Sequence, residues 1–469
     1  MKERPLPLPS LPIDPAPPGV GGNPAPGNAG TWILSFFLTL VLGFIPACLP
    51  SSPHPNLEQV LKISWESYRR DYLSPEGRVV LAERDGGTIS EAQAYALLRA
   101  VWSGDQATFA RVYAWTQAHL SRASRFGDHL LAWHWGKTRE GAGGVLDWHS
   151  AGDADLDYAL ALTLAHRRGW RPPPPLPLDL DEARAVARDI LAKEVVEIGG
   201  GGQGFPQART PVPLTPASYP KPPPPTPYRG LEGEFEGRAG ELRSPGPHHN
   251  SFLLLTPGNW HEERPPYLVN PSYFSPGTYR LLEQVAPDPR WKRLRADTYE
   301  LLDRLCRGLG GQAGVGLIPD WCRVDAGGRA EPAPGRDTDF GWEAVRLPWR
   351  VALDALWFKE RGAVRLMAGH FLPFFKKEWQ AKGRLAAVYS YEGKPLVNYE
   401  SPVMYAGALA AAMAAGDRDF AGQMARKILS AYHRDQSGRA YFATPDNYYA
   451  NNWAWFGLAL YTGWVQPLR

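Results

Sequence analysis

The chain has 469 residues, which allows one large domain or two or three domains of modest size. Hydrophobic residues make up 44% and charged residues 21%, and these proportions argue against wholesale disorder, a coiled coil and a polytopic membrane protein. The formal net charge is +3, so the charge balance gives no reason to expect nucleic acid as a partner.

The amino terminus has the composition of a leader. Residues 1–30 are dominated by Pro, Gly, Ala and Asn, and we expect them to be disordered. Within residues 31–50, an uncharged apolar run at 32–45 has the length of a signal-peptide core rather than of a membrane span. It leads into Ile-Pro-Ala-Cys at 45–48, which resembles a bacterial lipobox and makes Cys48 the predicted lipidation site. Either this lipid or an uncleaved hydrophobic anchor would place the exported chain at the cell envelope or outside the cell.

Apolar residues at helical spacing dominate the rest of the chain, and strand patterns are few, as at 251–256. We therefore predict an all-α protein. The expected helices cover residues 57–72, 90–102, 105–120, 126–135, 153–168, 181–194, 276–285, 290–309, 342–358, 361–375, 402–415, 417–432 and 451–463.

Residues 199–250 break this pattern with a Gly run at 199–202 and four prolines at 222–225. Because helical segments continue on both sides, we interpret this stretch as an irregular insertion in one domain, residues 57–469. Two helical domains joined there, each with its own core, are the alternative. A dozen antiparallel helices in one domain are what an (α/α)6 barrel, or six-hairpin toroid, requires, with apolar inner helices and amphipathic outer ones.

The cysteine and histidine patterns predict no metal centre and no cofactor. The three cysteines lack CxxC spacing, and no HExxH motif or spaced Cys and His set is present. If Cys48 carries a lipid, Cys306 and Cys322 remain, and they are expected either to pair in an oxidising compartment or to stay as two buried thiols.

Several helix starts and loops combine a carboxylate with aromatic side chains, a pairing that suits sugar chemistry. Aromatic faces stack on pyranose rings, and carboxylates bind hydroxyl groups. Hydrolysis of a glycosidic bond needs one carboxylic acid that is protonated and a second that is ionised. Taken singly, each of these residues also has a structural explanation as a helix cap, a helix-dipole partner or a core residue.

Taken together and in this order, the motifs resemble glycoside hydrolase family 8. The resemblance extends from about residue 57 to 465 and implies an (α/α)6 barrel and an inverting endo-acting hydrolase of cellulose, mixed-linkage glucan, xylan or chitosan. The motifs are Ser90-Glu91 with Tyr95, Trp133 with Trp135, Ala151-Gly152-Asp153, Asn270-Pro271-Ser272-Tyr273, Pro319-Asp320-Trp321, and Trp342-Glu343-Ala344 with Arg346.

The resemblance also implies roles for individual residues. Glu91 matches the general acid, Glu343 occupies the position of the general base, and Asp153 matches the residue that holds the sugar at the cleavage point. The implied substrate-binding residues are Trp133, Tyr273, Trp321, Asp155, Arg346 and Tyr95. Asp155 is also a candidate partner of Asp153. Arg346, one helical turn after Glu343, is expected to form an ion pair with it.

Glu343 departs from the family, in which many members have Asp at the base position. The extra methylene advances the carboxylate by about 1.5 Å. An inverting enzyme leaves about 6.5–9.5 Å between its two carboxyl groups for a water molecule, so Glu serves if the backbone or the water adjusts. Asp339 and Asp337 are the alternative bases.

The sequence thus predicts a monomeric, inverting, endo-acting hydrolase of β-1,4 links in a cellulose-like glucan, with exopolysaccharide processing as one biological setting. Its expected partner is the polysaccharide, with no nucleic acid and no membrane contact beyond the amino-terminal anchor. A chitosanase or xylanase of the same family is the alternative enzyme. A non-catalytic polysaccharide-binding protein on the same fold is the alternative of another class, prompted by the replacement at Glu343.

Overall fold

The computed structural model describes residues 56–172, 179–199 and 251–468. The predicted leader, Cys48 and all of the insertion beyond Gly199 lie outside these residues. The described part is mostly helical, as predicted. Its α-helices are α1 Leu57–Tyr72, α2 Ser90–Ser103, α3 Gln106–Leu120, α4 Ala123–Phe126, α5 Gly152–Arg167, α6 Asp179–Lys193, α7 Pro276–Val285, α8 Pro289–Arg307, α9 Leu347–Phe358, α10 Arg361–Leu366, α11 Leu372–Lys382, α12 Pro402–Ala415, α13 Arg418–Ser430 and α14 Tyr448–Tyr461.

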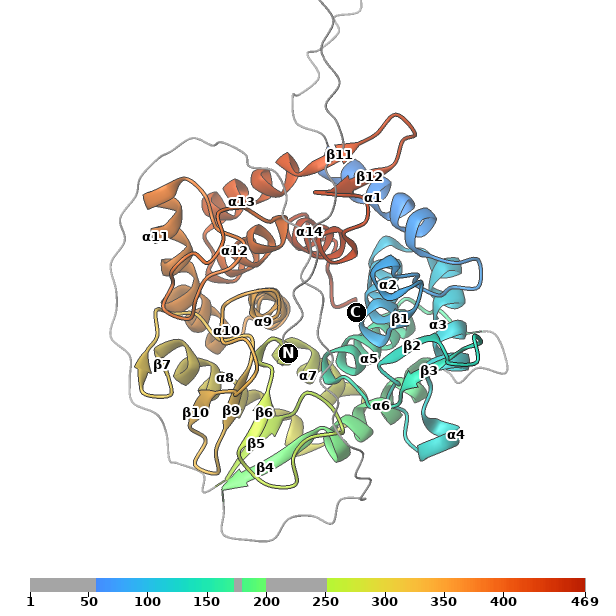
Figure 1. The fold of residues 1–469 in the computed structure, drawn as a ribbon, viewed down its shortest axis with the longest axis horizontal. Coiled ribbons are helices and arrows are strands. Elements are labelled where there is room, and N and C mark those ends of the chain that lie inside the picture. Colours follow the sequence, from blue (N-terminus) through green and yellow to red (C-terminus); the bar gives the residue numbers. More distant parts are fainter. Residues whose placement is uncertain (1–55, 173–178, 200–250, 469) are drawn as a thin grey trace, which may run out of the picture. The chain divides into compact units, whose positions relative to one another are not determined.

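The helices form an inner and an outer layer (Figure 1). Along the inner layer, α2 packs against α5, α5 against α7, α7 against α9, α9 against α12, and α12 against α14. The ring closes because Tyr95 and Trp102 of α2 pack against Phe456 of α14. The outer helices pair with inner ones, as α3 does with α2, α6 with α5, α8 with α7, and α13 with α12. This arrangement is the predicted (α/α)6 barrel.

Burial distinguishes the two layers. The inner helices α2, α5 and α12 are buried along nearly their whole length. The outer helix α8 buries one apolar face and exposes charged residues on the other. Small residues let the inner helices approach closely, since a methyl group on Gly457 of α14 would lie 2.8 Å from Cβ of Ala406 on α12. The packed core therefore lies between the layers and fills the ring of inner helices.

Short strands occupy the connections between helices. They are β1 Thr88–Ile89, β2 His134–Lys137, β3 Gly143–Asp147, β4 Val195–Gly199, β5 Ser251–Leu255, β6 Tyr267–Val269, β7 Gly308–Leu309, β8 Gln312–Ala313, β9 Cys322–Val324, β10 Ala330–Pro332, β11 Tyr432–Arg434 and β12 Ala440–Phe442. They pair antiparallel in the orders β1-β2-β3, β10-β9-β6, β4-β5, β7-β8 and β11-β12. The pairing of β4 with β5 brings together the two described ends of the chain that flank residues 200–250.

The predicted helix over 126–135 is wrong. Helix α4 ends at Phe126, and Gly127 closes it with a φ of 66°. The chain then enters β2, where Trp135 pairs with Thr88 of β1 and Val145 of β3. Apolar spacing over so short a run fits a strand as well as a helix, and Gly127 is the stop signal that decides between them.

The other predicted helices shift by up to three residues at an end, and two predicted segments differ by more. Helix α9 begins at Leu347 rather than near residue 342, because a 3₁₀ turn at Ala344–Arg346 precedes it. Glu343 therefore lies in the loop that enters this turn. The segment expected at 361–375 is α10 followed by a π-helical turn, Met367–Phe371, and then α11.

Cys306 and Cys322 are both buried free thiols, so the disulfide alternative is wrong. Within the described residues, no helix combines the length and the apolar character that crossing a membrane requires.

Candidate active site

Glu91, Asp153 and Glu343 converge on one guanidinium, that of Arg346. Arg346 Nη1 donates to Glu91 Oε2 at 2.6 Å and to Asp153 Oδ2 at 3.0 Å, while Nη2 donates to Glu343 Oε2. Glu91 lies in the first turn of α2 and Asp153 in the first turn of α5. The fold thus brings together all of the predicted catalytic residues, from parts of the sequence far from one another.

The cluster has a buried floor and an exposed side. The side chains of Arg346 and Asp153 are 2% and 3% exposed, whereas those of Glu91 and Glu343 are 15% and 18% exposed. The two candidate acid and base groups are therefore the ones that face solvent, and Arg346 holds them from below. A ligand that reaches the cluster meets these two carboxyl groups first.

The pKa of Glu91 is raised to about 7. Burial is the largest cause, and the negative charges of Asp153 and Glu343 raise it further, while Arg346 opposes them. One guanidinium cannot neutralise three carboxylates, so a proton on Glu91 relieves the excess negative charge. A carboxyl group protonated near neutral pH is what a general acid requires.

A second buried ion pair lies one helical turn further along α5 and α9 than the pair of Arg346 and Asp153. Arg350 Nη1 and Nη2 donate to Asp157 Oδ1 and Oδ2 at 2.5 and 2.8 Å, and both side chains are 2% exposed or less. Arg350 follows Arg346 by four residues, and Asp157 follows Asp153 by four, so each lies on the same helix face as its predecessor. This pair fixes α5 and α9 relative to each other below the cluster.

Glu343 is held by a side chain from the Asn270 motif as well as by Arg346. Asn270 Nδ2 donates to Glu343 Oε2 at 3.0 Å. Asn270 Oδ1 accepts from the Ser272 amide and hydroxyl, and Ser272 Oγ in turn accepts from Arg346 Nη2 at 2.8 Å. Hydrogen bonds from a guanidinium and an amide group to one oxygen favour an ionised carboxylate, so this arrangement suits a base.

The backbone that carries Glu343 is clamped from both sides. Asp320 Oδ1 accepts from the amides of Gly341, Glu343 and Ala344 at 3.1, 3.1 and 2.6 Å. The Tyr449 hydroxyl donates to the carbonyl oxygen of Trp342. Burial raises the pKa of Asp320, and the three amide donors oppose this. These contacts fix the position of the Glu343 backbone, from which its side chain extends.

The predicted aromatic residues occupy two places. Tyr273 and Trp321 contact each other edge to face, with ring centroids 6.3 Å apart, and the Arg346 guanidinium lies 5.4 Å from the Tyr273 ring centre. Trp133 lies on the other side of Glu91, since its carbonyl accepts from the Ser90 amide at 2.9 Å. The Trp133 ring is partly exposed and hydrogen-bonds Asp147. Of these rings, Tyr273 contacts the cluster directly, through Arg346.

Tyr95 and Asp155 do not face the substrate side, which corrects their predicted role. Tyr95 is 1% exposed and packs among Tyr448, Trp453 and Phe456. Asp155 is fully buried and accepts from the Leu131 amide at 2.8 Å. Asp155 lies in the first turn of α5 and Tyr95 in the second turn of α2, and both helices are buried at these positions, which the motif alone does not reveal.

The alternative bases Asp337 and Asp339 contribute backbone contacts. Their carbonyl oxygens accept from the amides of Trp321 and Asp320 at 3.0 and 2.7 Å. Glu343, rather than either aspartate, is the residue whose carboxylate bonds both Arg346 and Asn270. Sequence reasoning missed the roles of Asn270, Ser272, Asp320 and Tyr449, although the first three lie within quoted motifs.

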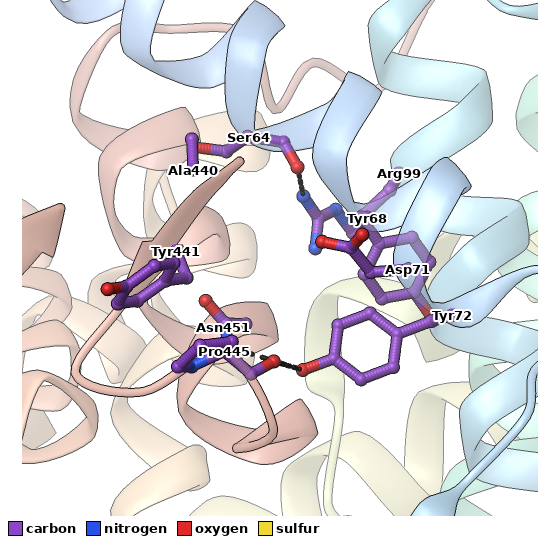
Figure 2. Close-up of a pocket in the computed structure, with 9 residues that line it drawn as sticks. All are labelled: Ser64, Tyr68, Asp71, Tyr72, Arg99, Ala440, Tyr441, Pro445 and Asn451. Carbon is purple, nitrogen blue, oxygen red and sulfur yellow. Dashed lines mark hydrogen bonds between the residues drawn. The ribbon is translucent and has the colours of Figure 1, made fainter. Parts of the chain in front are cut away.

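A separate small pocket lies between α1 and the segment from β12 to α14, as Figure 2 shows. Its volume is about 10 Å³, room for one water molecule. Arg99 stacks there on Tyr68 at 4.3 Å, and its Nη2 donates to the Ser64 carbonyl at 3.3 Å. None of the three clustered carboxylates lines this pocket. Within the described ranges, no group of His, Cys, Asp and Glu side chains has an arrangement that could hold a metal ion.

Comparisons with known proteins show the family of the chain. A profile of the glycosyl hydrolases family 8 matches residues 52–174 and 249–455. The gap between these two ranges contains α6 and β4 as well as most of residues 199–250. Endoglucanase A of Acetivibrio thermocellus is 24% identical over 428 residues, which cover 88% of this chain and 72% of that protein.

Solved structures share the fold. The endo-β-1,4-glucanase CMCax of Acetobacter xylinum matches with a TM-score of 0.57 and 20% identity, over 86% of this chain and 98% of that one. A β-1,3-1,4-glucanase of Paenibacillus sp. X4 matches with a TM-score of 0.62 and 18% identity, over 88% and 96% of the two chains. Given the family match over most of its length and this shared barrel, the chain belongs to glycosyl hydrolase family 8 and is an endoglucanase-like glycoside hydrolase.

Proposed function

We propose that this hydrolase cleaves internal β-1,4 links of a cellulose-like glucan with inversion, using Glu91 as the acid and Glu343 as the base. The observation that carries the proposal is the difference between the two groups. Glu91 has a pKa raised to about 7, whereas Glu343 Oε2 accepts from both Arg346 and Asn270. The names of its relatives, which include endoglucanases and a β-1,4-glucanase, support a glucan substrate.

The reaction follows from these positions. Protonated Glu91 donates its proton to the glycosidic oxygen as the bond from that oxygen to the anomeric carbon breaks. A water molecule attacks the anomeric carbon from the opposite face and gives a proton to Glu343. Asp153, held by Arg346 at 3.0 Å, accepts a hydrogen bond from a hydroxyl of the sugar at the cleavage point. Tyr273, Trp321 and Trp133 supply apolar faces for neighbouring sugar rings.

Substrate choice is tested with the purified chain lacking residues 1–50. We expect release of reducing ends from carboxymethylcellulose and lichenan, and an α-anomeric product when hydrolysis is followed by NMR. Faster release from chitosan or xylan would establish the alternative enzyme of the same family. A folded protein that binds glucan yet releases no reducing ends from any of these polymers would contradict catalysis and favour the binding protein.

We also propose that Cys48 is lipidated and that the enzyme acts on polymer at the cell envelope. The support is the apolar run at 32–45 followed by the lipobox-like Ile-Pro-Ala-Cys. Expressed in a bacterial host with an alkyne fatty acid, the full chain is expected to incorporate label. Cys48→Ala should abolish labelling, and Ser51→Ala serves as the matched control. Equal labelling of the Cys48→Ala variant and the control would contradict the assignment.

A further inference from the structure

Two fully buried carboxyl groups face each other behind the cluster. Asp155 lies in the first turn of α5, and Glu194 lies between α6 and β4. Each is 0% exposed, and the two side chains hydrogen-bond each other. Asp155 Oδ2 and Glu194 Oε2 find no donor group elsewhere among the described residues. Two ionised carboxylates have only acceptor oxygens, so a hydrogen bond between them requires a proton.

Among the described residues, no cation forms an ion pair with either carboxyl group. The positive charge of Arg122 lowers the pKa of both carboxyl groups, but Arg122 donates its hydrogen bonds to the two oxygens of Asp128, at 2.8 and 3.0 Å. Asp153, the remaining charged group that acts on Glu194, is bonded to Arg346. The other contacts are neutral donors, namely the Ser150 hydroxyl to Glu194 Oε1 and the Leu131 amide to Asp155 Oδ1. Neither contact offsets a second negative charge in a buried site.

We propose that Asp155 and Glu194 share a single proton and that the resulting hydrogen bond positions Asp153 and the start of α2 for the reaction. The positioning role rests on the proposed function, whereas the shared proton does not. Both residues are positioning residues, since neither reaches the substrate side.

The pair connects segments that carry the cluster. Asp155 holds the Leu131 amide, and two residues later the Trp133 carbonyl accepts from Ser90, next to Glu91. On the other side, the Glu194 carbonyl accepts from the amide and hydroxyl of Thr256, each at 2.8 Å.

The backbone next to Asp153 is closely packed and has little room to move. The amide of Gly152, the neighbour of Asp153, donates to the Pro257 carbonyl at 2.9 Å. A methyl group on Gly152 would lie 3.4 Å from Glu194 Oε2 and 3.2 Å from the Thr256 carbonyl oxygen. A change in the hydrogen bond between the carboxyl groups therefore moves the segment that carries Asp153.

The pair titrates in a defined direction. Burial raises the pKa of Glu194 from its ordinary 4.5 to about 7, and burial together with Glu194 raises the pKa of Asp155. Because the folded pKa is the higher one, this stabilisation is complete below about pH 4.5 and is lost as the pH rises through about 7. At alkaline pH, two unscreened negative charges would face each other.

Single amide substitutions test the shared proton. In Glu194→Gln, the amide nitrogen replaces the shared proton as the donor to Asp155, and in Asp155→Asn the same bond forms in reverse. We expect each single variant to match the melting temperature of the wild type at about pH 5 and to exceed it at about pH 8. Glu197→Gln, an exposed change nearby on β4, serves as the control.

The double variant gives the sharper result. In Asp155→Asn with Glu194→Gln, the Leu131 amide holds the carbonyl oxygen of Asn and the Ser150 hydroxyl holds that of Gln, so the two amide NH₂ groups face each other. We expect a loss of melting temperature far larger than the sum of the single effects. Additive effects, or single variants that are stabilised equally at both pH values, would overturn the shared proton.

Positioning is tested in two ways. Above about pH 7, log(kcat/KM) should fall with a slope of about −2 in the wild type, as Glu91 and the pair each lose a proton, and of about −1 in Glu194→Gln. At about pH 8, hydrogen exchange across residues 131–133 should be slower in Glu194→Gln than in the wild type. Identical exchange and identical slopes would overturn positioning.

Should no polymer be cleaved, the proposed function fails, while the melting and exchange measurements still decide this inference.

Discussion

Glu91→Gln is expected to lower kcat on the preferred glucan by about 10²- to 10⁴-fold while leaving the fold intact. Gln has the same length as Glu, and its carbonyl oxygen can accept from Arg346 Nη1 as Glu91 Oε2 does at 2.6 Å. The amide has no proton to give to the leaving oxygen. The measurement is reducing-end release together with the melting temperature. Glu300→Gln, an exposed change on α8, controls for the loss of one negative charge.

The substrate can distinguish loss of the acid from general damage. In a cello-oligosaccharide that carries a dinitrophenyl leaving group, dinitrophenolate leaves without being protonated. Glu91→Gln should therefore cleave this substrate nearly as fast as the wild type does. An equally large loss on this substrate and on the natural polymer would contradict the assignment of Glu91 as the acid.

The pH dependence of the wild type supplies a second check on Glu91. Its pKa is raised to about 7, chiefly by burial, and the proposed role as the acid requires the protonated form. Activity is therefore retained below this value and lost as the pH rises through it. In Glu91→Gln, the residual activity should no longer show this ionisation.

Residue order and spacing predicted much of the fold. Helices at 57–72, 276–285 and 402–415 have the predicted bounds. In each case a start signal, such as Asn56, Pro276 or Ser401 with Pro402, precedes a run of suitable periodicity. The failure at 126–135 has a local cause, since Gly127 ends α4 and the following residues gain their partners from β1 and β3, distant in sequence.

The catalytic residues of the candidate site could be predicted from the sequence. The contacts between loops that hold these residues in place could not. Glu91, Asp153, Glu343 and Arg346 were each assigned from a motif, and they lie in one cluster. The clamp by Asp320 joins residues more than twenty positions apart, and the Tyr449 contact joins residues more than a hundred apart. No helical or strand period links such positions, so only the folded chain reveals them.

Glu343 carries the second large prediction, because it is the candidate base. Glu343→Ala is expected to lose activity by about 10²- to 10⁴-fold, since no base remains to deprotonate the attacking water. Added azide should restore part of the rate, because this anion attacks without deprotonation, and the product should be the α-glycosyl azide. Full activity of Glu343→Ala would contradict the assignment, and Asp339→Asn and Asp337→Asn would then identify the base.

Glu343→Asp keeps a carboxylate at this position, yet we expect it to lower kcat by about 10²-fold. Asp320 and Tyr449 fix the backbone at residues 341–344, so the loop cannot advance to compensate for a shorter side chain. The carboxylate would retreat by about 1.5 Å from Arg346 and Asn270 and from the attacking water. If the clamp sets this distance, Glu343→Asp combined with Tyr449→Phe, which releases the Trp342 carbonyl, should recover activity relative to Glu343→Asp alone. A Glu343→Asp variant as active as the wild type would show that the water, rather than the clamped backbone, accommodates the longer side chain.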